Sequence, residues 1–189
     1  MTRTATPVVR PSIATRGRAL ALALPCALLC ALLPHAALAL PGFRALPARG
    51  VEAANVEQAR VLALSLLRRA RPALGPEDVR LADAAARELA AARFLASTDQ
   101  QSLRTCASRD YSLFVDPQEP RRIYICDEVR PYARAGGAAA IAVLAQGFVH
   151  ESAHLTGVHD ECAATRFELA VMDRTIGRRS AGSRISYRC

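Results

Sequence analysis

Apolar residues recur with the 3.6-residue period of an α-helix in four stretches of the chain, with polar residues between them. The first stretch is closed by Pro72. The second begins at Pro76, and Glu77 and Asp78 follow where acidic side chains stabilise the start of a helix. The third stops at Gly157. This pattern predicts helices over residues 51–70, 76–95, 135–155 and 160–176.

Two short runs of β-type residues, 111–115 and 122–126, flank a loop that contains Pro117 and Pro120. This pattern predicts two strands joined by the loop. Residues 40–50 are rich in proline and glycine and are expected to form an irregular lead-in. Helices outnumber strands and the two kinds are segregated along the chain. The sequence therefore predicts an α+β fold, mainly helical, with a small strand pair before the third helix.

The charge of the chain argues against nucleic acid as a partner. All 25 basic residues are arginine, against 17 acidic residues. Four of the arginines lie in residues 1–39, which hold no acidic residue, so residues 40–189 keep 21 arginines and a formal charge of +4. A mild excess spread along the chain is typical of a solvated surface rather than a phosphate-binding stripe. About 150 residues suffice for a single domain with its own core.

The beginning of the chain has the pattern of an export signal. After the arginines, residues 19–33 form an apolar run, and Ala37-Leu38-Ala39 has the small-x-small form of a signal-peptidase site. We expect residues 1–39 to be a signal peptide and residues 40–189 to be exported, periplasmic or secreted, with no membrane attachment after cleavage. The alternative is an uncleaved anchor over residues 19–40, which is nearly long enough to span a bilayer.

Export changes the interpretation of the six cysteines. Two of them fall in the signal, and Cys106, Cys126, Cys162 and Cys189 remain. An even number in an exported chain of this size indicates disulfides, for which three pairings exist. We expect Cys106–Cys126 and Cys162–Cys189, which pair near neighbours in sequence. Four reduced thiols are the alternative that a cytosolic address would favour.

One cluster of residues carries candidate chemistry, the HExxH motif His150-Glu151-Ser152-Ala153-His154. In a helix, positions i and i+4 share a face, so His150 and His154 can reach one metal ion. Glu151 lies beside them and can act as a general base towards a metal-activated water. A helix with two surface histidines is the alternative without chemistry. A catalytic zinc site further needs a third protein ligand and one open position.

The motif and the residues after it resemble the zincins, the HExxH zinc metallopeptidases. Within that group, Glu161-Cys162-Ala163-Ala164-Thr165 is similar to the Glu-x-x-Ala-Asp pattern of gluzincins, with Thr165 where the pattern has Asp. The stretch 150–161 also resembles small exported HExxH proteins of GC-rich bacteria. The resemblance covers about residues 122–172 and says little about the rest of the chain.

This resemblance implies a zincin-like metallopeptidase that hydrolyses peptide bonds in a peptide or protein substrate. It implies one Zn2+ ion as the cofactor, with Glu151 as the general base. The implied metal ligands are His150, His154 and Glu161.

Asp160 is the alternative third ligand. It stands at the last position of the HExxHxxGxxH motif of metzincins, which Gly157 also matches, whereas His159 misses that position by one residue. Asp160 equally suits the N-cap of the last predicted helix, and this assignment leaves Glu161 as the ligand. Cys162 could replace Glu161 as a ligand, but a disulfide is expected for it.

Other assignments stay open at the level of the sequence. Tyr124, Arg166 and Tyr187 are candidates for a hydrogen-bond donor to the reacting oxygen. The strand 122–126 is either an edge strand along which a substrate lies extended, as in zincins generally, or a core strand. Close helix packing is the expected role of Gly147.

Two further functions compete with the peptidase: a non-catalytic zinc-binding protein, and a disulfide-tied helical binding protein. The sequence specifies neither the substrate specificity nor the oligomeric state.

Overall fold

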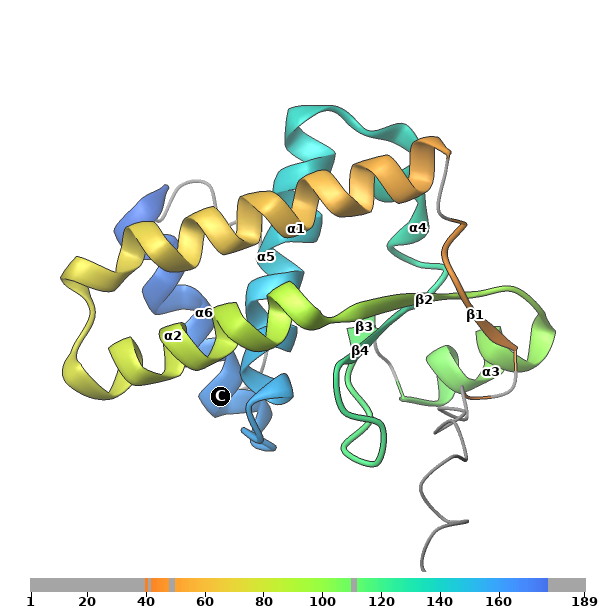
Figure 1. Ribbon diagram of the computed structural model, residues 1–189. Helices are drawn as coiled ribbons and strands as arrows, with labels where there is room; N and C mark the ends of the chain where they lie inside the picture. Colours follow the sequence, from red (N-terminus) through yellow and green to blue (C-terminus); the bar gives the residue numbers. More distant parts are fainter. Residues whose placement is uncertain (1–39, 41, 48–49, 110–111, 177–189) are drawn as a thin grey trace, which may run out of the picture. The chain divides into compact units, whose positions relative to one another are not determined.

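Helices account for most of the chain that the structure describes. The structure is a computed structural model (Figure 1), and it describes residues 40, 42–47, 50–109 and 112–176. The predicted signal peptide, residues 1–39, lies outside this part. Within it, no helix combines the length and the apolar character needed to cross a membrane.

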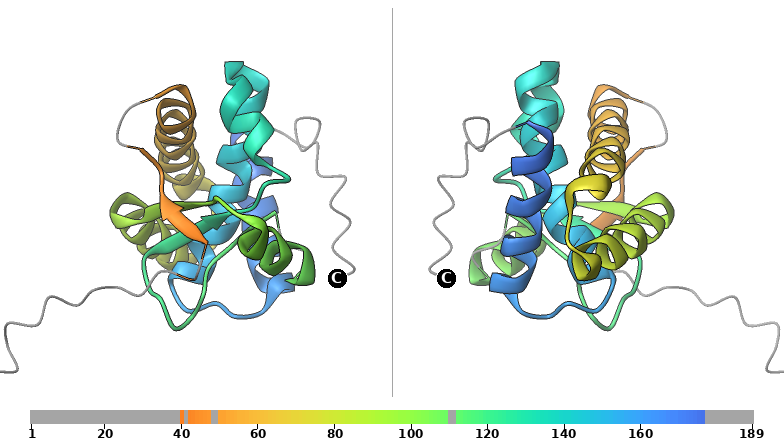
Figure 2. Two further views of the ribbon diagram at one scale, coloured as in Figure 1. Left: turned by 90° about the vertical axis from the view of Figure 1, so that its right-hand side faces the viewer. Right: turned by 90° about the vertical axis from the view of Figure 1, so that its left-hand side faces the viewer.

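Four long helices form one layer of the fold. They are α1 (Val51–Ala70), α2 (Pro76–Ala91), α5 (Gly137–Leu155) and α6 (Glu161–Thr175), and a short 3-10 helix, η2 (Arg71–Ala73), follows α1. The first of them contacts the other three (Figures 1 and 2). Alanines without exposed surface, such as Ala59 and Ala63, let the helices approach closely. We call the apolar cluster that these helices bury the helical core.

A four-stranded sheet forms the second layer. Its strands are β1 (Phe43–Ala45), β2 (Arg93–Ser97), β3 (Leu113–Phe114) and β4 (Arg122–Ile125), in the order β1-β2-β4-β3. The middle pair, β2 and β4, is parallel, and the two outer pairs are antiparallel. The mainly helical α+β class is confirmed, and the predicted strand pair corresponds to β3 and β4.

Successive residues of β4 point to opposite faces of the sheet, which separates two apolar clusters. Ile123 and Ile125 belong to the helical core. Tyr124, together with Cys126 just after the strand, belongs to a smaller cluster. We call this smaller group the aromatic cluster; its buried members are Phe43, Leu95, Cys106, Phe114, Tyr124 and Cys126.

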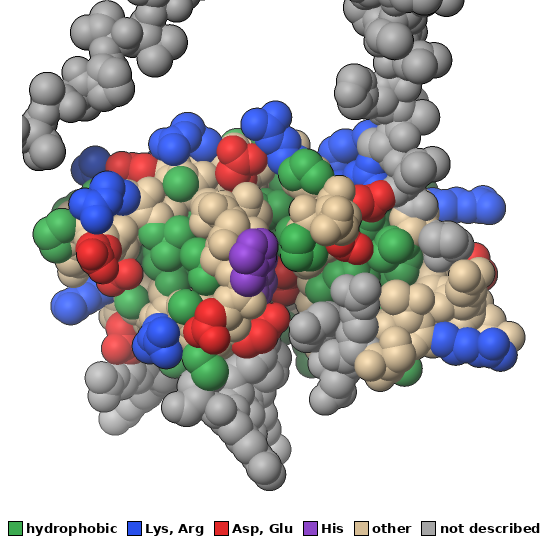
Figure 3. Space-filling view, turned by 90° about the horizontal axis from the view of Figure 1, so that it is seen from below, with side chains coloured by type: hydrophobic (Ala, Val, Ile, Leu, Met, Phe, Trp, Pro, Cys, Tyr) green, Lys and Arg blue, Asp and Glu red, His purple; other side chains and the backbone are tan. Residues whose placement is uncertain are grey.

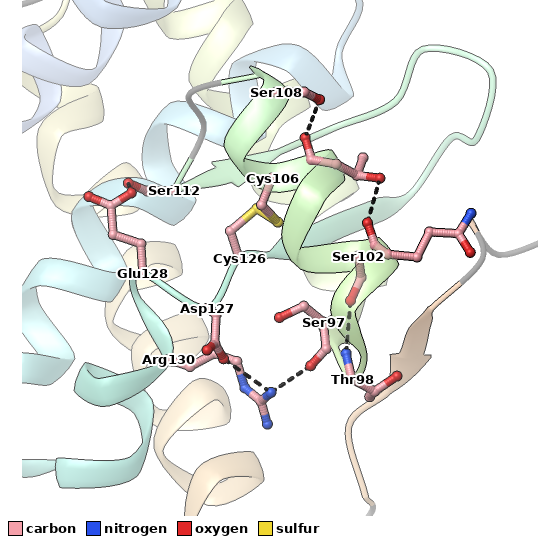
Figure 4. Close-up of a disulfide and its surroundings, with 12 residues drawn as sticks. Ser97, Thr98, Ser102, Cys106, Ser108, Ser112, Cys126, Asp127, Glu128 and Arg130 are labelled. Carbon is pink, nitrogen blue, oxygen red and sulfur yellow. Dashed lines mark hydrogen bonds and ion pairs between the residues drawn. A yellow bond between two sulfur atoms is a disulfide. The ribbon is translucent and has the colours of Figure 1, made fainter.

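A disulfide joins helix α3 (Gln100–Arg109) to the sheet (Figure 4). It links Cys106 of α3 to Cys126, directly after β4, and so confirms the first predicted pair. Asp99 caps the start of this helix, because its carboxylate accepts hydrogen bonds from the backbone N–H groups of the second and third residues of α3 at 2.9 and 3.0 Å. The second predicted disulfide includes Cys189, which lies outside the described residues.

The helix predicted over residues 76–95 is too long. It ends at Ala91, because Ala92 adopts an extended conformation with φ −68° and ψ 146°. The residues after it form β2, where Phe94 pairs with Ile123 and Leu95 with Tyr124. Pairing with a strand distant in sequence thus overrides the helical spacing of these apolar residues.

The helix predicted over residues 135–155 corresponds to α5, which begins at Gly137 and ends at Leu155, and a further short helix before it was not predicted. A short helix, α4 (Arg130–Ala135), precedes α5, and Gly136 between them has φ 65°. A side chain at Gly136 would approach the Asn55 amide to 2.7 Å. That amide donates a hydrogen bond to the carbonyl of Ala133 at 2.6 Å. The break therefore allows α1 to hold the end of α4.

The position of β4 decides between the two interpretations of residues 122–126. The strand pairs with β2 on one side and β3 on the other, and its four residues are buried. The edge-strand interpretation is therefore wrong and the core-strand interpretation is right. In the described part of the chain the sheet ends at β1 and β3, and β1 lies within the segment that was expected to be an irregular lead-in.

Candidate metal centre

The end of α5 and the beginning of α6 together form the candidate site. The HExxH motif lies in the last turns of α5, where His150 is only 4% exposed. Gly157, with φ 95°, allows the chain to turn after α5. Asp160 then caps α6, because its carboxylate accepts a hydrogen bond from the backbone N–H of Ala163 at 2.7 Å. The turn and the cap return Glu161 to the two histidines.

Three potential ligand atoms converge at this point. The Nε2 atom of His150 lies 3.1 Å from Oε2 of Glu161 and 3.2 Å from Nε2 of His154. The Nε2 atom of His154 lies 3.4 Å from the same carboxylate oxygen. A tetrahedral zinc site with bonds of about 2.0–2.2 Å separates its ligand atoms by roughly 3.3–3.5 Å. The three atoms therefore have the spacing of three vertices of such a site.

In each histidine, the hydrogen-bond partner of Nδ1 determines that Nε2 carries the lone pair directed at the other potential ligands. Nδ1 of His154 lies 2.6 Å from the carbonyl of Val158, which can only accept a hydrogen bond. Nδ1 of His150 lies 3.2 Å from a carboxylate oxygen of Glu168. Both Nδ1 atoms therefore carry hydrogen, and in neutral rings both Nε2 atoms present lone pairs. Two lone pairs and a carboxylate facing one another require a cation or a proton between them.

The sequence prediction missed Glu168. Its side chain is buried, and it meets His150 through one oxygen and the amide of Gln146 through the other, at 3.2 and 2.6 Å. A signal for it was present, since Glu168 follows Glu161 by seven residues. Two helical turns place both residues on the same face of α6.

Buried charge shifts the pKa values at the site. Burial of His150 opposes protonation, but the hydrogen bond that the ring donates to Glu168 and the charges of Glu151 and Glu168 outweigh it, so the pKa of His150 is raised. Burial raises the pKa of Glu151 to about 8; His150 opposes this shift, and the charges of Glu161 and Glu168 add to it. One carboxylate oxygen of Glu151, Oε2, has no hydrogen-bond partner.

Among the described residues, none of the remaining candidates from the sequence belongs to the group of three ligand atoms. Asp160 is the N-cap of α6, with its side chain 68% exposed, and it is not part of the ligand cluster. His159 is exposed. Tyr124 is buried in the aromatic cluster, where its hydroxyl donates to Glu119. Arg166 is exposed on α6, and Tyr187 lies outside the described residues.

Gly147 has the role expected for it, close packing of its helix. A Cβ atom at this position would lie 2.5 Å from Cδ1 of Leu113. Gly147 precedes His150 by three residues on α5, so β3 reaches the helix that carries the histidines.

The site opens to solvent at Glu161. The Glu161 side chain is 42% exposed and that of His154 is 12% exposed, whereas Glu151 is 5% exposed. Figure 3 shows a face of the molecule with histidine at the surface beside acidic side chains, and among the histidines of the described residues His159 is the exposed one. An ion held by His150, His154 and Glu161 would thus be approached from the Glu161 side.

No family model, curated protein or solved structure matches this chain.

Proposed function

We propose that this protein is an exported zinc-dependent peptidase, in which His150, His154 and Glu161 hold one Zn2+ ion and Glu151 is the general base. The observation that supports it most is the set of three facing acceptor atoms, spaced 3.1–3.4 Å apart. Two nitrogens and a carboxylate oxygen are a donor set that zinc accepts, with a fourth position left for water or substrate.

The chemistry divides between the ion and the side chains. Bound at this site, zinc supplies Lewis acidity, which lowers the pKa of a water molecule and polarises a carbonyl. Glu151 accepts the proton of the attacking water and returns it to the leaving amine. Its unpaired oxygen is available for that proton. The ionised form of Glu151 is favoured next to a divalent cation, despite the burial that raises its pKa without one.

A non-catalytic zinc-binding protein is the second candidate, and the burial of Glu151 favours it. A general base must reach water and substrate, and this side chain is only 5% exposed. The two candidates agree about the metal and differ about hydrolysis.

Bound zinc per chain and peptide hydrolysis, measured side by side, test the proposal. Glu151→Gln should abolish hydrolysis and retain zinc, since the amide keeps the shape but cannot accept the proton. Glu161→Gln should lose zinc, because a neutral group replaces a charged ligand. Asp160→Asn is the matched control and should retain zinc, as Asn caps a helix about as well as Asp.

Each failure has its own meaning. A wild-type protein without stoichiometric zinc would overturn both candidates. Zinc without hydrolysis would favour the non-catalytic protein. Loss of zinc in Asp160→Asn and its retention in Glu161→Gln would transfer the third ligand to Asp160.

A further inference from the structure

Glu168 is held from both sides by residues of α5. Its Oε2 atom is 3.2 Å from Nδ1 of His150, and its Oε1 atom accepts a hydrogen bond from the Gln146 amide at 2.6 Å. Gln146 precedes His150 by four residues, so one face of α5 presents both groups to one carboxylate. Both oxygens of Glu168 therefore have a fixed partner, and its side chain is 6% exposed.

The Glu168 carboxylate determines which nitrogen of His150 carries hydrogen and which can bind a metal. An acceptor on Nδ1 keeps the hydrogen there and leaves the lone pair on Nε2, the atom that faces Glu161 and His154. A negatively charged acceptor also makes Nε2 a stronger ligand. His154 has only the neutral carbonyl of Val158 for the same purpose. The group that accepts from Nδ1 is therefore charged for His150 and neutral for His154.

The neighbouring position on α6 does not share this role. Thr165 precedes Glu168 by three residues and is also buried, but its hydroxyl has no hydrogen-bond partner. In the similarity to the gluzincin pattern, Thr165 stands where an Asp is expected. In this chain the carboxylate lies at position 168 instead.

We propose that Glu168 is a positioning residue for the metal, acting through His150, and that Gln146 acts on the metal only through Glu168. This inference rests on the proposed zinc site and adds two residues to it. Neither residue touches the ion; together they set the direction and the donor strength of one ligand.

A double-mutant cycle on zinc affinity tests the chain of contacts. Affinity is measured on the full exported protein by competition with a chelator, without any activity assay. Glu168→Gln should weaken zinc binding 10- to 100-fold, the usual effect of removing such a partner. Gln146→Leu, of similar size, should weaken it less, by roughly 3- to 10-fold, since Glu168 stays charged but loses its clamp. In the double variant Gln146→Leu should add nothing, because its effect passes through Glu168.

Two further measurements separate positioning from general damage. Thr165→Val is the matched control on the same helix and should leave zinc affinity unchanged within about twofold. The absorption spectrum of the Co2+-loaded protein reports the ligand field directly, and it should change in Glu168→Gln but not in Thr165→Val. Circular dichroism of each variant shows whether its helix content is retained.

The possible outcomes are distinct. Unchanged affinity and Co2+ spectrum in Glu168→Gln, with zinc bound normally by the wild type, would overturn this inference and leave the zinc site standing. Equal losses of zinc affinity in Thr165→Val and Glu168→Gln would also overturn it. If the losses of Gln146→Leu and Glu168→Gln add up in the double variant, the part of the inference that concerns Gln146 is wrong. Absence of zinc from the wild type would instead be a failure of the proposed function.

Discussion

The helical core and the aromatic cluster lie on opposite sides of β4 and are stabilised in different ways. The described residues place 24 buried side chains in the first and six in the second. The helical core joins segments far apart in the chain, and its members are mostly aliphatic. The aromatic cluster contains a disulfide and three rings, of which Phe114 and Tyr124 are stacked with centroids 4.7 Å apart. A small cluster buries too little apolar surface to hold helix α3 by burial alone, and the disulfide adds the missing stabilisation.

The two regions also differ in their buried polar groups. In the aromatic cluster, Glu119 accepts hydrogen bonds from Tyr124 and Arg122, so opposite charges meet within the protein. Beside the helical core, the carboxylates of Glu151, Glu161 and Glu168 lie around His150. The first arrangement is balanced as it stands. In the second, the proposed zinc ion would offset the charge of the carboxylates.

The largest effect is expected from a truncation in the helical core. Phe148 has no exposed surface, and its ring centroid lies 4.7 Å from that of Phe94. Phe148→Ala should lower the free energy of unfolding by about 3–5 kcal/mol, measured by urea denaturation. Val143→Ala on the same helix, where the side chain is 44% exposed, is the control and should change it by less than about 0.5 kcal/mol. A similar loss in both variants would mean that this core is not closely packed.

Removing the disulfide should come next. Cys106 and Cys126 are 20 residues apart, and for a loop of this size their joint replacement by alanine should cost about 3 kcal/mol. Because the candidate metal centre adjoins the other core, zinc affinity should stay unchanged. Urea denaturation measures the loss of stability, and chelator competition measures the zinc affinity. A tenfold loss of zinc affinity in this variant would show that the two regions are not independent.

Alkaline pH should weaken the aromatic cluster alone. Burial raises the pKa of Tyr124 to about 12, and the hydrogen bond to Glu119 adds to the shift. The ordinary pKa of tyrosine is 10.0, so the unfolded chain loses this proton at a lower pH than the folded protein does. The stabilisation is thus complete below pH 10 and is lost between pH 10 and 12, by up to about 2 kcal/mol. Urea midpoints across this range should fall less in Tyr124→Phe than in the wild type. Tyr132→Phe, at a half-exposed position, should follow the wild type.

The smallest effect concerns Gly147, where β3 meets α5. Alanine there gains about 1 kcal/mol of helix propensity but approaches the Leu113 side chain to 2.5 Å. Gly147→Ala should therefore change the unfolding free energy by less than about 1 kcal/mol. In a Leu113→Ala background the contact is gone, and the same change should stabilise by about 1 kcal/mol. A stabilisation of equal size in both backgrounds would show that Leu113 does not restrict this position.

Local patterns in the sequence were sufficient to predict the four long helices and to place the two histidines of the motif on one face of α5. The apolar spacing of α1 and α6 and the stop at Gly157 are properties of single segments, and His150 and His154 are related by one helical turn. The N-cap role of Asp160 follows in the same way from its position before a helix. Each of these predictions depends on neighbours within a few residues.

The elements that were missed depend on partners far along the chain. β1 and β2 are short, and each becomes a strand by pairing with residues about 30–50 positions away. α3 has few apolar residues to mark it, and its cap and disulfide hold it instead. Glu168 has an ordinary position on an amphipathic helix, and only the return of α6 to α5 brings it to His150. Tertiary contacts of this kind leave little trace in a single sequence.

The packing of α1 against α5 and α6 has a consequence for the order in which the protein matures. The apolar face of α1 is complete only when helices nearly a hundred residues later have been made, and the three ligand atoms belong to those same helices. A chain that crosses a membrane unfolded would therefore have neither core nor metal site until it emerges. Zinc would be acquired in the compartment where the chain folds, and uptake of the ion would report that folding is finished.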